Sequence, residues 1–334
     1  MLARLRRGLP DPFLLGIMGA AALGAALPCS GSSATLLGVL TKVAIAVMFF
    51  MQGVKLSRTA VLAGIGHWRL HLAIVACTFA VYPLLGLLLG IAAQQLLPPA
   101  LWTGLIFVCL LPSTVQSSIA YVSMARGNVA AAVCAATASN LLGIALTPAL
   151  AAAVLHTQGF AIRFDDILKI GSQILAPFVL GQLLQPWLSG WAQRHKSVLT
   201  LSDRGSIILV VYTAFSAATL QGVWRTVAAA DLVWIVALEV ILLAIVFAVT
   251  SIGSRALRFS KEDEIAIAFC GTKKSLASGA PIASVLFPPA LLGAVIVPLV
   301  LFHQMQLMAA AFVARKYAAR PTPQSDLQED RPAA

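Results

Sequence analysis

Charged residues are scarce in this chain of 334 residues, because only 10% of them are Asp, Glu, Lys or Arg. A soluble globular protein carries about 25%. Hydrophobic residues make up 60% of the chain, and the mean hydropathy is +0.91. These values exclude a water-soluble globular domain and indicate an all-α polytopic membrane protein that lies in the lipid bilayer.

Residues arranged for catalysis or for tight metal binding are also missing. The five cysteines are scattered through apolar segments without paired spacing, so neither a disulfide framework nor a zinc site is predicted. No metal-ligand spacing, nucleophile elbow or nucleotide-binding loop is present. We therefore expect no enzyme, no cofactor and no nucleic acid partner, and the sequence does not indicate an oligomeric state.

Ten apolar runs have the length of about 20 residues that a helix needs to cross a bilayer. They cover residues 12–29, 34–53, 70–93, 101–125, 129–153, 167–187, 204–221, 232–253, 264–287 and 290–313. An even number of spans places both termini on one side. A cleaved secretory signal at the N-terminus is the alternative and would leave nine spans.

The basic residues test this topology. With the N-terminus inside, only Arg163, Lys169 and Arg225 of the 23 lysines and arginines lie outside, and Lys42, Lys273 and Lys274 lie within spans. The other seventeen are cytoplasmic, as the positive-inside rule requires. The net charge of +11 is therefore explained by membrane topology. We expect an integral protein of the bacterial inner membrane, a plasma membrane, with both termini in the cytoplasm.

Two of the spans are interrupted at their centres by polar residues. Pro112, Ser113 and Thr114 break the fourth span, and a segment with glycine and two lysines (residues 271–275, GTKKS) breaks the ninth. Such breaks at membrane depth are tolerated only where the freed backbone groups line a cavity or a polar core. Ordinary kinks in packed helices are the simpler alternative.

The two breaks lie at matching places in the two halves of the chain. Residues 1–153 and 154–319 each hold five spans, and 320–334 form a polar tail that we expect to be disordered and cytoplasmic. Because five is odd, the second half enters from the opposite side, so the halves would be inverted repeats. Paired broken helices in such repeats are typical of secondary transporters with a site between them.

Four segments are characteristic: residues 111–121 (LPSTVQSSIAY), 126–128 (RGN) with Thr147 and Pro148, 269–282 (FCGTKKSLASGAPI) and 302–308 (FHQMQLM). Together these segments resemble the bile acid:sodium symporter family, and more closely its SBF-like branch. The resemblance implies a panel domain of spans 1, 2, 6 and 7 and a core domain of spans 3–5 and 8–10. Substrate would bind between them, and motion of the core against the panel would give alternating access.

The sodium ligands of the family's bile-acid-transporting members are largely replaced here. Aligned on the shared motifs, Phe269 stands at the acidic ligand, Lys273 at the glutamine and Ile119 at the asparagine. Ala132 and Ala136 stand at the hydroxyls. So few hard oxygen ligands beside ammonium groups should hold sodium poorly.

Charge at the breaks suggests what replaces sodium. The second halves of both broken helices direct their positive N-terminal ends into the crossing. We expect Glu239, the one carboxylate deep in a span, to neutralise one of Lys273 and Lys274. The other lysine is either a built-in cation or a group that couples transport to protons, so sodium and protons both remain possible coupling ions. The surplus positive charge favours a small organic anion, such as a carboxylate or sulfonate, as the substrate.

The candidate substrate- and ion-binding residues share a place at the two breaks or opposite them. The hydroxyl and amide groups after Pro112 either line a cavity or satisfy freed carbonyls, and His303 and Gln306 share a face as interhelical contacts or a proton path. The full set is Ser113, Thr114, Gln116, Ser117, Ser118, Ser139, Asn140, Glu239, Thr272, Lys273, Lys274, Ser275, His303 and Gln306.

Three functions are compatible with this sequence. The first is a secondary active transporter of a small organic anion. The second is a membrane regulator of ion homeostasis that keeps the fold and transports nothing. The third is a cation/proton exchanger that uses Glu239 and the lysines.

Overall fold

Every regular element in the described part of the chain is a helix, of α, π or 3-10 type. The computed structural model describes residues 12–55, 67–156, 164–225 and 227–320. Predictions on other residues, including the first arginines, Arg163 and the tail 321–334, lie outside the described residues. Six described helices are long and apolar enough to cross a membrane. The coarse prediction of an all-α polytopic membrane protein is therefore confirmed.

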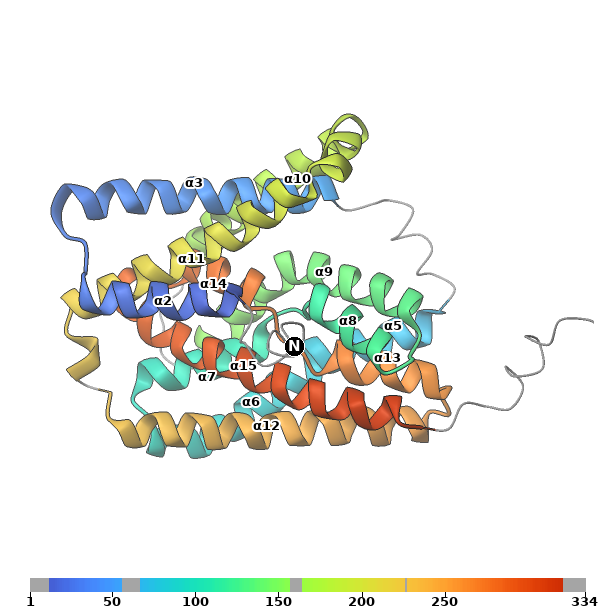
Figure 1. The fold of residues 1–334 in the computed structure, drawn as a ribbon. Coiled ribbons are helices and arrows are strands. Elements are labelled where there is room, and N and C mark those ends of the chain that lie inside the picture. The colour runs from blue at the N-terminus through green and yellow to red at the C-terminus, as the bar shows by residue number, and fades with distance from the viewer. Residues whose placement is uncertain (1–11, 56–66, 157–163, 226, 321–334) are drawn as a thin grey trace, which may run out of the picture.

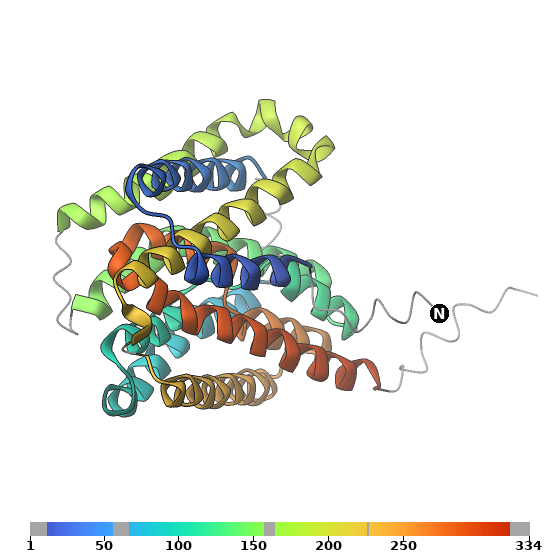
Figure 2. The same ribbon diagram turned by 60° about the vertical axis from the view of Figure 1, so that its left-hand side comes forward.

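Four helices form one group, in which α3 and α10 lie at the edge of the molecule in both ribbon views (Figures 1 and 2). The four are α2 (Pro12–Ala26), α3 (Gly31–Lys55), α10 (Phe164–Arg194) and α11 (Lys196–Leu220). Glycines allow α3 and α10 to approach closely. A Cβ on Gly53 would overlap the backbone carbonyl oxygen of Phe178, and one on Gly181 would overlap that of Phe50. Small residues at such contacts are the usual means by which membrane helices pack.

The other helices form a second group, with α12 at the opposite edge from α3 (Figures 1 and 2). Its interior is closely packed around Phe107, Phe269 and Phe302, none of which is exposed. The elements are α5 (Trp68–Ala76), η2 (Cys77–Val81), α6 (Tyr82–Leu96), α7 (Pro99–Leu110), α8 (Gln116–Met124), α9 (Val129–His156), α12 (Ala229–Ala256), α13 (Lys261–Gly271), α14 (Leu276–Leu286) and α15 (Pro289–Ala318). A 3-10 turn, η3 (Val223–Arg225), precedes α12.

Both predicted interruptions are present. The fourth predicted span consists of two short helices, α7 of 12 residues and α8 of 9 residues. The ninth consists of α13 and α14, each of 11 residues. Since each half is too short to cross a bilayer alone, these spans are not among the six long apolar helices. Simple kinks are excluded, because the backbone between the halves is not helical.

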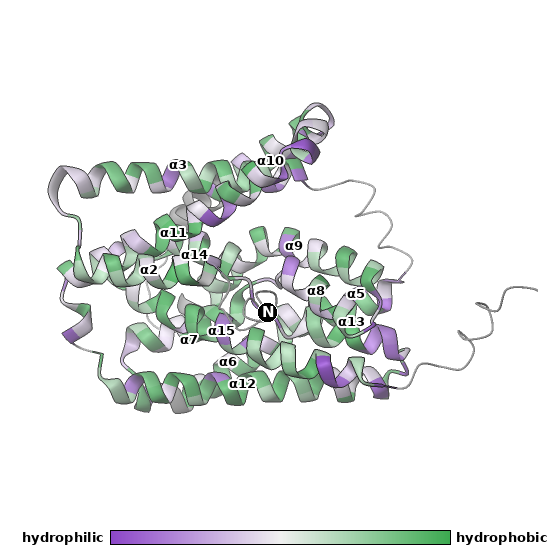
Figure 3. Cartoon of the chain, viewed as in Figure 1, coloured by the Kyte–Doolittle hydropathy of each residue, from purple (hydrophilic) through white to green (hydrophobic). Residues whose placement is uncertain are grey.

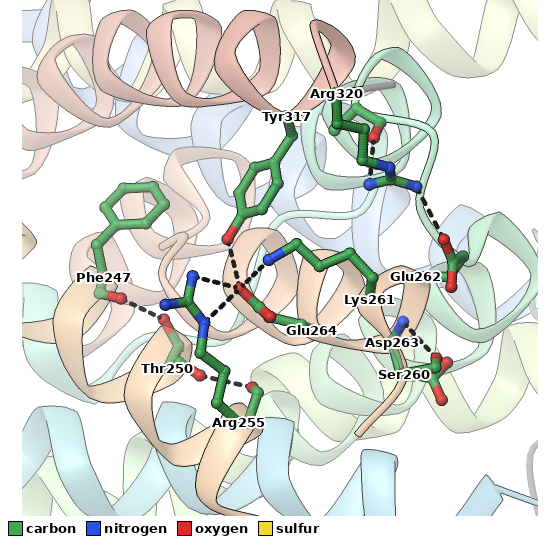
Figure 4. A network of polar contacts seen from close by, with 12 residues as sticks. Phe247, Thr250, Arg255, Ser260, Lys261, Glu262, Asp263, Glu264, Tyr317 and Arg320 are labelled. Carbon is green, nitrogen blue, oxygen red and sulfur yellow. Dashed lines mark hydrogen bonds and ion pairs between the residues drawn. The ribbon is translucent and has the colours of Figure 1, made fainter. Parts of the chain in front are cut away.

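Polar residues gather at one end of the molecule, beside α5 and α13, while α12 is hydrophobic along most of its length (Figure 3). At that end the Glu264 carboxylate accepts hydrogen bonds from Lys261 at 2.8 Å, Tyr317 at 2.9 Å and the Arg255 Nη2 at 3.1 Å (Figure 4). Arg320 pairs with Glu262 at 2.9 Å. The network joins α12, α13 and α15 at one end of the molecule.

Candidate functional site

The first interruption frees carbonyl groups at the end of α7, and polar groups of other segments bind several of them. Four carbonyls at a helix C-terminus have no intrahelical partner, and Pro112 has no N–H to offer. The Leu110 oxygen accepts from the Thr147 hydroxyl at 2.9 Å, and the Pro112 oxygen accepts from the Ser275 N–H at 2.9 Å. The Ser113 N–H donates to the Ser139 hydroxyl at 3.1 Å. The first break is therefore tied to both α9 and the second break.

The second interruption frees the carbonyl groups of residues 268–272, and hydroxyl and thiol groups satisfy them. The Ser113 hydroxyl donates to the Cys270 oxygen at 2.5 Å, and the Ser118 hydroxyl donates to the Phe269 oxygen at 3.2 Å. The Thr272 hydroxyl donates to the Ala268 oxygen at 2.6 Å. The Cys77 thiol donates to the Gly271 oxygen, and the Tyr82 hydroxyl donates to the Thr272 oxygen. Ser113, Ser118 and Thr272 thus stabilise the break itself.

Lys274 extends into the first break. Its ammonium nitrogen lies 2.8 Å from the Thr78 oxygen, 2.9 Å from the Cys109 oxygen and 2.7 Å from the Leu111 oxygen. The ring centroid of Tyr82 is 4.1 Å away. The side chain has no exposed surface.

The Lys273 side chain points in a different direction from that of Lys274. Its ammonium lies 3.7 Å from the ring centroid of Tyr121 and is fully buried. It has no hydrogen-bond partner among the described residues. The ring of Tyr121 stacks on Phe269 with centroids 6.0 Å apart. The two lysines therefore occupy different environments, against different aromatic rings.

Gln306 of α15 holds the backbone of the second break. Its side-chain oxygen accepts from the Lys274 N–H at 2.7 Å, and its side-chain nitrogen donates to the Lys274 carbonyl at 2.8 Å. The same nitrogen lies 3.0 Å from His303 Nδ1. The structure thus places Gln306 against the second break and His303 beside Gln306 on the same helix.

The predicted ion pair between Glu239 and a lysine is wrong. Glu239 on α12 is fully buried, but among the described residues neither of its oxygens has a hydrogen-bond partner and no lysine lies within ion-pair distance. The physical reason is that the Lys274 ammonium is already saturated by backbone carbonyls, and Lys273 lies against Tyr121.

A cavity of about 570 Å³ lies between the two helix groups. From the second group it is lined by residues of the two breaks and of α8, α9, α14 and α15. The polar ones are Thr114, Gln116, Ser117, Thr137, Asn140, Ser275, Ser278 and His303. Six of the predicted site residues therefore line this cavity, while Ser113, Ser118, Ser139, Glu239, Thr272, Lys273, Lys274 and Gln306 are not part of its lining.

The hydroxyl and amide groups on the cavity wall bond to one another. The Thr114 hydroxyl is 2.7 Å from the Ser117 hydroxyl, and the Ser278 hydroxyl donates to Asn140 Oδ1 at 2.7 Å. Asn140 Nδ2 in turn lies 3.4 Å from Gln52 Oε1 on α3. Asn140 therefore connects the two helix groups across the cavity.

The first helix group contributes residues that the sequence analysis did not assign to a site. Lys55 and Asp203 form an ion pair of 2.5 Å, and the Arg204 guanidinium lies 5.1 Å from the ring centroid of Phe13. All four residues line the cavity, together with Gln52. Lys55 and Arg204 lie at or near the ends of predicted spans, which indicated only cytoplasmic charge. Lys42, which lies within a predicted span, is exposed and does not line the cavity.

The helix ends give this cavity a positive potential. α8 begins at Gln116 and α14 begins at Leu276, and both of these residues line the cavity. A helix N-terminus carries roughly half a positive charge. Among the described residues Arg204 forms no ion pair with an acid, so it adds one more positive charge to the wall. Two helix N-termini and the Arg204 guanidinium therefore face the same cavity.

A helical membrane protein with two interrupted helices and a polar cavity between helix groups belongs to the class of membrane transporters. The chain is a member of the SBF-like CPA transporter family, whose profile matches residues 11–319. The predicted resemblance to this branch is thereby confirmed, and the protein is a transporter of this type in an integral membrane setting.

Named relatives agree with this assignment. The symporter candidate YfeH of Escherichia coli K12 is 47% identical over 320 residues, which cover 96% of each chain. A Pseudomonas aeruginosa protein is 49% identical over 315 residues, covering 94% of this chain and 95% of its own length. The mouse sodium/bile acid cotransporter 7 is 26% identical over 315 residues, covering 91% of each chain.

Proposed function

We propose that this protein is a secondary active transporter that carries a small organic anion across the bacterial inner membrane. The observation that supports this most strongly is the cavity of about 570 Å³ on which the N-terminal ends of α8 and α14 both open. Helix N-termini favour negative charge, and Arg204 adds a cation to the same wall. Apolar lining residues such as Phe178 and Leu307 suit the organic part of the substrate.

The topology that we propose has ten spans in two inverted repeats of five. α2, α3, α10 and α11 form the panel, and the other helices form the core. In support, the cavity is lined from both sets of helices. Both termini are cytoplasmic in this arrangement. The cytoplasmic position of the termini is supported by three basic residues that are predicted to be cytoplasmic and belong to one polar network at one end of the molecule (Figure 4). They are Arg255, Lys261 and Arg320.

The conformation is the one that opens to the cytoplasm. Lys55, Asp203 and Arg204 line the cavity and lie toward the helix ends that this topology places inside. Toward the opposite end, the later part of α11 packs tightly on α15. There a Cβ on Gly293 would overlap Ala218 and would lie 2.9 Å from the Ala214 oxygen. Separation of α11 from α15 at this contact would open the cavity to the other side.

Binding of organic anions to the purified protein tests the proposal. A substrate should raise the unfolding temperature, because binding to the folded state alone stabilises it by about 2.7 kcal/mol at a hundredfold excess over Kd. Arg204→Gln should weaken that binding roughly tenfold or more, since a hydrogen bond to a charged group is worth about 1.5–3 kcal/mol. Arg194→Gln is the matched control, because Arg194 is exposed and lies outside the cavity.

Transport itself is measured with protein in liposomes. Uptake of the stabilising anion supports the proposal, and the same assay with and without sodium, and with an imposed pH gradient, identifies the coupling ion. Failure of a broad set of carboxylates and sulfonates to stabilise the protein or to accumulate would contradict it.

A cation/proton exchanger is the second candidate, and one observation favours it. Glu239 and Lys273 are ionisable, fully buried and without a hydrogen-bond partner among the described residues. Intramembrane ionisable groups commonly mark ion or proton pathways. Proton movement driven by a cation gradient, in liposomes that contain no organic solute, would favour this function. Absence of both activities would favour the regulator.

A further inference from the structure

The surroundings of the Lys274 ammonium are made of backbone. Its three contacts at 2.7–2.9 Å are the carbonyl oxygens of Thr78, Cys109 and Leu111, and no side-chain carboxylate is among them. The face of Tyr82 lies 4.1 Å away. We call these three oxygens and the ring the carbonyl cage.

The cage arises from proline residues and not from the lysine. In the π-helical turn η2 the Thr78 oxygen would accept from the N–H five residues later, but that residue is Pro83, which has none. The Cys109 and Leu111 oxygens are free because α7 ends before Pro112. A helix C-terminus also carries roughly half a negative charge. The backbone alone therefore creates a region of negative potential at the place that the Lys274 ammonium occupies.

The charge state of Lys274 follows from the geometry. An ammonium has three N–H donors, and three acceptors surround it at hydrogen-bond distance. A neutral amine has two N–H groups and a lone pair, so one carbonyl would face the lone pair. The ring face of Tyr82 also attracts a cation. The arrangement fits a full positive charge.

Backbone carbonyls directed at one point are also the ligands with which proteins hold desolvated monovalent cations. We propose that the carbonyl cage is a monovalent cation site that the chain fills permanently with its own ammonium group. The native protein then needs no metal ion at this place. Removal of the side chain should open the site to Na⁺, K⁺ or a primary alkylammonium. This inference does not depend on which anion is transported.

Gln306 keeps the ammonium in the cage. It binds both the N–H and the carbonyl of Lys274, at 2.7 and 2.8 Å, so the backbone of the break cannot rotate without losing two buried hydrogen bonds. Lys273 provides the contrast within the same break. It is equally buried, but it touches a ring and no carbonyl cage.

The experiment replaces Lys274 by alanine and measures the unfolding temperature of the purified protein. NaCl, KCl, choline chloride and n-propylammonium chloride are compared at equal ionic strength. Alanine keeps the Cβ, so n-propylammonium supplies the missing atoms. Lys273→Ala is the matched control.

We expect Lys274→Ala to unfold several degrees lower in choline and to recover, in a saturable manner, with Na⁺, K⁺ or n-propylammonium. Lys273→Ala should show no such recovery. A folded Lys274→Ala that responds to none of these cations would overturn the proposal. The native chain serves as a second control: stabilisation by Na⁺, K⁺ or n-propylammonium should be larger in Lys274→Ala than in the native chain, and an equal response of the two proteins would overturn the proposal as well.

Discussion

The contact between α3 and α10 predicts a large effect of the smallest side-chain addition, Gly53→Ala. The new Cβ would overlap the carbonyl oxygen of Phe178 and would lie 2.9 Å from the Gln182 nitrogen. Both neighbours are backbone atoms, so no rotamer change relieves the overlap, and the two helices must part by about 1 Å to restore van der Waals distances. Overpacking of this kind typically lowers the free energy of unfolding by about 1–3 kcal/mol.

The reciprocal variant should behave in the same way. In Gly181→Ala the Cβ would overlap the carbonyl oxygen of Phe50, on the facing helix. Because one separation of α3 and α10 relieves both overlaps, the double variant should lose less free energy than the sum of the single variants. The cavity should also be affected, since Gln52 and Lys55 flank Gly53 on its wall.

Both helices carry a glycine that serves as a control. A Cβ on Gly38 of α3 or on Gly190 of α10 meets no atom within 4 Å. Alanine is favoured over glycine in a helix by about 0.5–1 kcal/mol, so Gly38→Ala and Gly190→Ala should be neutral or slightly stabilising. The assay is denaturant unfolding of the detergent-purified protein. If Gly53→Ala and Gly181→Ala were as stable as these controls, the close approach of the two helices would be refuted.

Three further substitutions and one surface control are measured by the same unfolding assay. Ser113→Ala removes the donor to the buried Cys270 carbonyl and should reduce the free energy of unfolding by about 1–3 kcal/mol, with an unchanged value counting against this contact. Glu239→Gln should change stability by less than about 1 kcal/mol, because an unpaired carboxyl group in the apolar interior is neutral and the amide has nearly the same shape; a large loss would indicate a charged, paired carboxylate. Glu264→Gln should lower the free energy of unfolding by about 1.5–3 kcal/mol, because it weakens the hydrogen bonds that the carboxylate accepts from three donors. Glu262→Gln, the control, breaks one exposed ion pair and should cost about 0–1 kcal/mol. Equal losses in the two variants would contradict the network.

Much of the candidate site could be found from the sequence because breaks in apolar spans are local signals. Pro112 and the segment around Lys273 interrupt hydrophobic runs, and the helices end there in the structure. The approach of Gln306 to the break could also be predicted, since it follows from a polar residue placed mid-span. The two interruptions depend on residues near one another in the chain.

Contacts between distant segments could not be predicted in this way. The pairing of Glu239 with a lysine was inferred from opposite charge alone. It is wrong because the Lys274 ammonium donates its hydrogen bonds to backbone carbonyl groups. The π-helical turn that exposes the Thr78 oxygen has no simple periodic signature. Lys55, Asp203 and Arg204 were indistinguishable in sequence from other basic and acidic residues at helix ends.

The sequence by itself determined the membrane setting, the transporter family and the two interruptions, since low charge, long apolar runs and prolines act through local hydration and backbone chemistry. Only the tertiary structure decided where the two adjacent lysines point and which residues line the cavity. The reason is that a helix break frees carbonyl groups whose partners come from other helices, and the packing of those helices determines which donor reaches each of them.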